Sequence, residues 1–98
     1  MISLPGRRTV HLEIQGRVQG VGFRIWAERE AARRNLDGWV RNRADGTVEA
    51  VFAGDEQAVQ SMTQACRRGP THAIVAAVAE LDPPPDPGPG FRVLPTER

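Results

Sequence analysis

A glycine-rich segment followed by an arginine is the strongest chemical signal in this sequence of 98 residues. Gly16, Gly20 and Gly22 fall within seven positions, and Arg24 follows two positions after the last of them. Glycines let successive backbone N–H groups converge on an anion, and the first N–H groups of a helix lack partners. The guanidinium of Arg24 adds a planar, charged fork that matches phosphate oxygens. The segment predicts a phosphate site, with a sharp turn beside a solvated arginine as the alternative.

Asn42 is the second residue whose type and place are suited to chemistry. It closes the segment 38–42, which reads GWVRN, and the pair Asp45-Gly46 follows as a turn signal. A side-chain amide offers an acceptor and donors, so an asparagine at the end of a strand can orient a water molecule. Taken alone, such an asparagine more often caps a turn.

The composition excludes several classes of protein. The chain has no lysine and no tyrosine, and its thirteen arginines face twelve acidic residues, for a formal net charge of +1. Without lysine there is no Walker-type phosphate loop, no pyridoxal-phosphate Schiff base and no serine–lysine hydrolase. So small a net charge gives no strong electrostatic attraction to nucleic acid.

The remaining composition predicts a small cytoplasmic domain. Cys66 is the only cysteine, which excludes an internal disulfide and a multi-cysteine metal centre. The longest apolar run, 73–79, is far too short to cross a bilayer, and the chain does not open on a signal-peptide pattern. We therefore expect one domain over residues 1–98, in the cytoplasm and away from membranes, with residues 1–7 as a short N-terminal extension.

The order of the elements predicts an α+β fold. Residues 9–15 alternate between apolar and polar types, as in a half-buried strand, and 16–22 form a loop. A helical pattern begins at Phe23 and ends near Asn35. The later pattern predicts two strands joined by a turn, over residues 36–42 and 47–53. A helix over 55–69 follows, capped by Asp55 and stopped by Gly69-Pro70. A Pro/Gly-rich connector, 82–90, then leads to a short last strand, 91–94. Residues 73–81 fit a helix as well as a strand.

This order corresponds to a ferredoxin-like α/β sandwich. We expect two helices packed on one face of a four- to five-stranded, mostly antiparallel sheet (βαββαβ with a short last strand), with residues 95–98 as a tail. His11 and His72 are expected to be solvated, and Cys66 to be a small buried hydrophobe. The bulky pair Ile25-Trp26 is expected to narrow any pocket beside Arg24.

The two candidate segments together resemble the two signatures of the acylphosphatase family. Segment 16–24, GRVQGVGFR, is similar to the first signature. Segment 38–49, GWVRNRADGTVE, with Gly54 beyond it, is similar to the second. The order of the elements also matches, so the resemblance covers about residues 10–93. Two long signatures, separated along the chain as they are in the family, outweigh the alternatives of a simple glycine turn and a turn-capping Asn42.

The resemblance implies a hydrolase that converts acyl phosphates to a carboxylate and inorganic phosphate, without a metal ion or cofactor. The family's catalytic arginine falls on Arg24 and its catalytic asparagine on Asn42. It also implies that 73–81 is a strand. The expected partner is a small-molecule acyl phosphate, a phosphate or sulfate ion is expected to fit the same site, and a monomer is expected. The family's phosphate-binding loop falls on Gly16, Arg17, Val18, Gln19, Gly20, Val21 and Gly22.

Two other functions stay open. One is a phosphate- or carbamoyl-phosphate-binding module like the acylphosphatase-like domain of a hydrogenase maturation protein, although that domain belongs to a much longer chain. The other is an RNA-binding sheet of the RRM type, because 19–26 faintly resembles its aromatic signature. Those residues are expected to open a helix instead of lying on a central strand, and the small net charge also counts against RNA.

Overall fold

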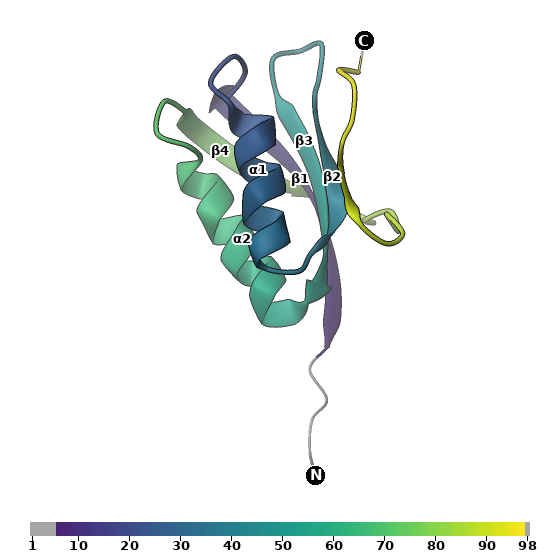
Figure 1. The fold of residues 1–98 in the computed structure, drawn as a ribbon. Helices are drawn as coiled ribbons and strands as arrows, with labels where there is room; N and C mark the ends of the chain where they lie inside the picture. Colours follow the sequence, from purple (N-terminus) through teal and green to yellow (C-terminus); the bar gives the residue numbers. More distant parts are fainter. Residues whose placement is uncertain (1–5, 98) are drawn as a thin grey trace.

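The computed structural model describes residues 6–97 as two helices packed on one face of a five-stranded sheet (Figure 1). The expected N-terminal extension lies outside the described residues except for Gly6 and Arg7, and so does Arg98 of the expected tail. In chain order the elements are β1 (Arg7–Arg17), α1 (Phe23–Arg33), β2 (Asp37–Asn42), β3 (Val48–Asp55), α2 (Glu56–Arg68), β4 (Ile74–Leu81) and β5 (Phe91–Val93).

The sheet has the order β4-β1-β3-β2-β5. All neighbours run antiparallel except β2 and β5, which are parallel. The ferredoxin-like α+β fold is therefore confirmed, and the ambiguous segment 73–81 forms an edge strand. None of the helices in the described part of the chain is long and apolar enough to cross a membrane.

The core lies between the sheet and the two helices, as the alternation of β1 predicts. The apolar residues of β1 point inward, and β3, at the centre of the sheet, is buried along all but its last residue. Full burial of each large apolar side chain contributes about 1.5–3 kcal/mol. Cys66 belongs to this core, and burial raises the pKa of its thiol to about 12, as expected of an inert small hydrophobe. The largest buried side chains include Leu12, Ile14, Phe23, Phe52 and Met62.

β1 runs further than its sequence pattern indicates. We expected a loop over 16–22, but Gly16 and Arg17 belong to β1, and the loop proper is 18–22. The pairing of β1 with β4 shifts register between Gln15 and Gly16, which breaks the alternation that marked the strand. At Gly16 the φ angle is 127°, and a Cβ atom would lie 2.2 Å from the backbone oxygen of Ile74. Gly16 therefore permits close approach of β4.

The proline-rich connector 82–90 brings the C-terminal segment back beside β2 (Figure 1). The rings of Phe91 and Phe52 stack, with centroids 5.6 Å apart and an interplanar angle of 8°. Beyond β5 the chain keeps following β2, because the N–H of Leu94 donates to the Val40 oxygen at 2.9 Å. The last strand is thus held by both side-chain packing and backbone hydrogen bonds.

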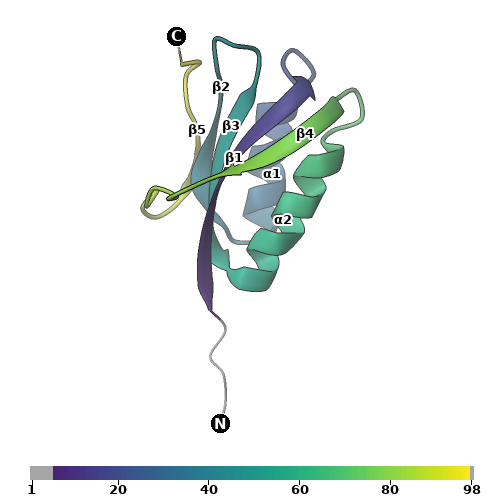
Figure 2. The same ribbon diagram turned by 180° about the vertical axis from the view of Figure 1, so that it is seen from behind.

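Figure 2 shows the face of the sheet that the helices leave open. This face carries a polar network that the sequence pattern did not reveal. His11 was expected to be solvated, which is wrong: its Nε2 lies 2.6 Å from Oε2 of Glu49, and the side chain is largely covered. Arg41 Nε donates to Glu49 Oε1 at 2.8 Å. Burial tends to raise the pKa of Glu49, which is only 6% exposed, but the hydrogen bonds with Arg41 and His11 bring it below its usual 4.5. His72, by contrast, is exposed as expected.

We predict that Glu49→Gln lowers the pH dependence of stability. Because the pKa of Glu49 is lower in the folded chain than in the unfolded one, the carboxylate's contribution is complete above about pH 4.5 and disappears as the pH falls through the folded pKa. The unfolding free energies of wild type and variant should converge on acidification. Urea unfolding between about pH 6 and pH 3 measures this, and a difference independent of pH would contradict it.

Candidate active site

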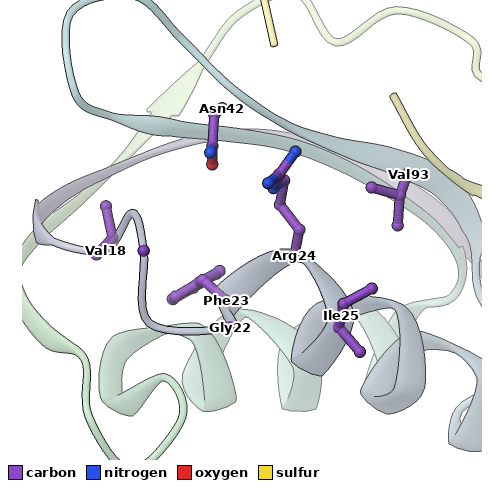
Figure 3. A pocket seen from close by; sticks show the side chains of 8 residues that line it. Val18, Gly22, Phe23, Arg24, Ile25, Asn42 and Val93 are labelled. Carbon is purple, nitrogen blue, oxygen red and sulfur yellow. The ribbon is translucent and has the colours of Figure 1, made fainter. Parts of the chain in front are cut away.

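A pocket of about 240 Å³ opens between the start of α1, the loop before it and the ends of β2 and β5 (Figure 3). Among the described residues 6–97, Arg24 is the only charged side chain in its lining, and Asn42 is the only other polar one. The rest of the lining is glycine or apolar. The lining residues are Val18, Gly20, Gly22, Phe23, Arg24, Ile25, Asn42 and Val93.

Arg24 projects from the first turn of α1 into this pocket, towards Asn42 (Figure 3). Arginines elsewhere in the fold pair with carboxylates, as Arg34 does with Glu30 at 2.8 Å. Within residues 6–97, by contrast, Arg24 forms no ion pair or side-chain hydrogen bond with the protein. Its guanidinium therefore keeps its full set of donors for a ligand.

The N-terminus of α1 is left without a cap from the protein. Gly22 occupies the N-cap position in a left-handed conformation, with φ 80° and ψ 20°, and no side chain accepts from the first turn. That turn also lacks an acidic residue. Helix α2 is the opposite case, because Asp55 accepts hydrogen bonds from the N–H groups of Gln57 and Ala58. The free N–H groups and the dipole of α1 therefore favour an anion at the pocket.

Asn42 comes to the same pocket from the far end of β2. It lies two residues after the fully buried Val40, so it shares the helix-facing side of the sheet. β3 holds it on one side, through pairing with Val48. On the other side the C-terminal segment holds it, because the backbone N–H of Glu97 donates to the backbone oxygen of Asn42 at 2.9 Å.

The carboxylate of Glu97 strengthens that second contact. Its oxygens lie 3.1 Å from Arg41 Nη2 and 3.3 Å from Arg43 Nε, so one side chain joins the two residues that flank Asn42. Residues 95–98 were expected to form only a tail. The pairing with β2 continues past the last apolar residue of the chain. Such a segment has no apolar periodicity, so the sequence pattern could not predict the pairing.

The structure separates the seven predicted loop residues into two groups. Val18, Gly20 and Gly22 line the pocket together with Arg24 and Asn42. The other four do not line the pocket. Gly16 and Arg17 end β1, and Val21 packs against the core. The side chain of Gln19 points to the turn between β2 and β3.

Gln19 joins the loop to the turn that follows Asn42. Its Nε2 donates to the backbone oxygens of Arg43 and Thr47, at 2.8 and 2.9 Å. The two predicted halves of the site are thus connected by a side chain as well as by the sheet. Gln19 contributes to the position of the loop through this contact.

Three apolar residues of the lining were not predicted as site residues. Ile25 was noted only for its bulk, Phe23 as the start of the helix, and Val93 as part of the last strand. The segment 19–26 opens α1 and does not form a central strand, which removes the basis of the RRM interpretation.

Solved structures with this fold include an acylphosphatase and a HypF protein. An acylphosphatase from Bacillus subtilis is 37% identical, with a TM-score of 0.81 over 88% of this chain and 97% of that chain. A full-length HypF, in its phosphate- and nucleotide-bound form, has a TM-score of 0.84 over 97% of this chain but only 13% of that chain. At 22% identity, the HypF likeness shows a common fold and no more.

The sequence comparisons agree with the structural ones. A curated acylphosphatase from Azorhizobium caulinodans is 55% identical over 89 residues, which cover 90% of this chain and 96% of that protein. The family model for acylphosphatase matches residues 10–93, a span that contains the whole pocket lining. The chain therefore belongs to the acylphosphatase family of enzymes.

Proposed function

We propose that this chain hydrolyses small-molecule acyl phosphates to a carboxylate and inorganic phosphate, with Arg24 binding the phosphoryl group and Asn42 aligning the attacking water. The observation that carries the proposal is the meeting of these two side chains at the uncapped N-terminus of α1. Relatives named acylphosphatase support the substrate class.

The phosphoryl group would be bound by charge and by backbone donors. In phosphoryl transfer the charge spreads over three equatorial oxygens, so catalysis consists mainly of positioning and electrostatic stabilisation. Arg24 offers a bidentate fork to two of these oxygens, and the free N–H groups at the start of α1 offer further donors. The lining residues that the structure describes include no carboxylate that would repel the substrate.

Asn42 would direct a water molecule at phosphorus, in line with the bond that breaks. Its amide oxygen accepts a hydrogen bond from the water, which fixes the direction of the lone pair that attacks. The water oxygen bonds to phosphorus while the acyl–oxygen–phosphorus bridge breaks on the phosphorus side, and the electron pair leaves with the carboxylate. A proton of the water passes to an oxygen of the phosphoryl group itself.

This route needs neither a strong general acid nor a metal ion. A carboxylate is a good leaving group at neutral pH, because the parent acid has a pKa near 4. In the part of the chain that the structure describes, no histidine, aspartate or glutamate lines the pocket, which is consistent with proton transfer to the substrate's own oxygen. We therefore expect hydrolysis to persist in EDTA.

Some expectations about the wider protein have no direct structural test. A monomeric state, a cytoplasmic location, a single domain over residues 1–98 and the lack of nucleic-acid partners stay predictions. A further expectation, that a phosphate or sulfate ion occupies the pocket, bears on the mechanism, because either ion would mimic the transferred group.

Arg24→Ala should lower kcat/KM for benzoyl phosphate, assayed with EDTA present, by about 1,000-fold or more. Arg24→Lys should recover little of this, because an ammonium group lacks the planar fork. Arg33→Ala is the matched control, since Arg33 lies exposed in the last turn of the same helix. Retention of activity by a folded Arg24→Ala variant would show that another group binds the phosphate.

Asn42→Ala should lower kcat by about 100-fold or more and leave the inhibition constant of inorganic phosphate within a few-fold of wild type. The reason is that the amide acts on the water and not on the bound phosphoryl group. Steady-state kinetics with phosphate as a competitive inhibitor separate the two effects. Near-normal turnover would refute the water-aligning role, and equal losses of phosphate binding and turnover would assign Asn42 to phosphate binding instead.

A further inference from the structure

The pocket has two chemically different ends. Arg24, Asn42 and the glycine backbone supply its polar groups, whereas Ile25 and Val93 are aliphatic and both lie on the side of Arg24 away from Asn42 (Figure 3). The other two apolar lining residues, Val18 and Phe23, are only 1% and 2% exposed and belong to the core. A volume of about 240 Å³ is more than a phosphate group of five heavy atoms requires. Space is therefore left beside the aliphatic pair.

The exposure of Ile25 is unusual for this fold. It is 55% exposed, whereas Phe23, two positions earlier on the same helix, is 2% exposed and part of the core. Among the residues that the structure describes, only Ile25 and Ile74 are large hydrophobic side chains with this degree of exposure. Ile74 lies on β4, outside the pocket lining. Packing of the core thus does not account for the apolar character of Ile25.

Val93 faces Ile25 from the other side of the pocket (Figure 3). It is held there by the parallel pairing of β5 with β2, in which Val93 lies opposite Val40. The two aliphatic side chains thus come from a helix and a strand that the fold fixes independently. A rigid apolar wall of this kind selects ligands by the area that they bury against it.

We propose that Ile25 and Val93 bind the acyl group of the substrate, so that the enzyme prefers acyl phosphates with an apolar, bulky acyl group. The inference rests on the proposed function, which places the phosphoryl group against Arg24. With the phosphoryl group there, the acyl group has the aliphatic pair as its neighbour. A charged acyl group would lose water against this pair, and within the described residues the lining of this pocket offers it no second cation beside Arg24.

The expected preference is about 10-fold or more in kcat/KM, since even one buried methylene group discriminates by about 10- to 200-fold. Wild-type enzyme should favour benzoyl phosphate over acetyl phosphate by at least this factor. It should also favour benzoyl phosphate over 4-carboxybenzoyl phosphate, which has the same ring with an added negative charge.

The decisive variant is the double substitution Ile25→Thr with Val93→Thr, because threonine keeps the β-branched shape and adds a hydroxyl group. The ratio of kcat/KM for benzoyl phosphate to that for acetyl phosphate should fall by about 10-fold. Ile74→Thr is the matched control, since it changes an equally exposed isoleucine outside the pocket and should keep the wild-type ratio. The ratio cancels a general loss of folded enzyme.

Two results would overturn the inference while the proposed function stands. One is a wild-type enzyme that hydrolyses acetyl, benzoyl and 4-carboxybenzoyl phosphate with equal kcat/KM. The other is a double variant whose ratio matches that of wild type. A folded wild-type enzyme that hydrolyses none of the three would instead refute the proposed function, and the acyl preference with it.

Discussion

The uncapped first turn of α1 is the constraint on which the site depends. Its N–H groups have no partner within the helix, and Gly22 offers them no side-chain acceptor. The same chain caps α2 with the carboxylate of Asp55, so the difference is local and specific. Donors left free beside a cationic side chain form a preorganised anion site, which requires no reorganisation when charge moves during the reaction. A protein carboxylate that accepted from these N–H groups would occupy the place of a substrate's phosphate.

The sheet and two smaller contacts bring Asn42 to that helix end. β3 lies buried at the centre of the sheet and holds β2 on one side, while β5 and the segment after it hold β2 on the other. Glu97 joins Arg41 and Arg43 around Asn42, and Gln19 ties the loop to the next turn. In the proposed mechanism a water must be aimed within a narrow range of angles for in-line attack, so rigid support on both sides of Asn42 would have a direct catalytic consequence.

Much of this arrangement could be predicted from the sequence, and the rest could not for definable reasons. The glycines, Arg24 and Asn42 carry their chemistry in their residue types, and the alternation of β1 predicts its buried face. The register shift at Gly16 interrupts that alternation, so β1 was predicted too short. The pairing of His11 with Glu49, and the place of Val93 in the pocket, depend on contacts between strands distant in the chain. Local patterns contain no information about such contacts.

The most direct test of the mechanism is the fate of an oxygen label. Hydrolysis of benzoyl phosphate in water enriched with oxygen-18 marks the atom that the water attacks. Attack at phosphorus, where Arg24 and Asn42 meet, places the label in inorganic phosphate and leaves benzoate unlabelled. Label in benzoate would show attack at the carbonyl carbon, and would contradict a site built to hold the phosphoryl group as the reacting centre.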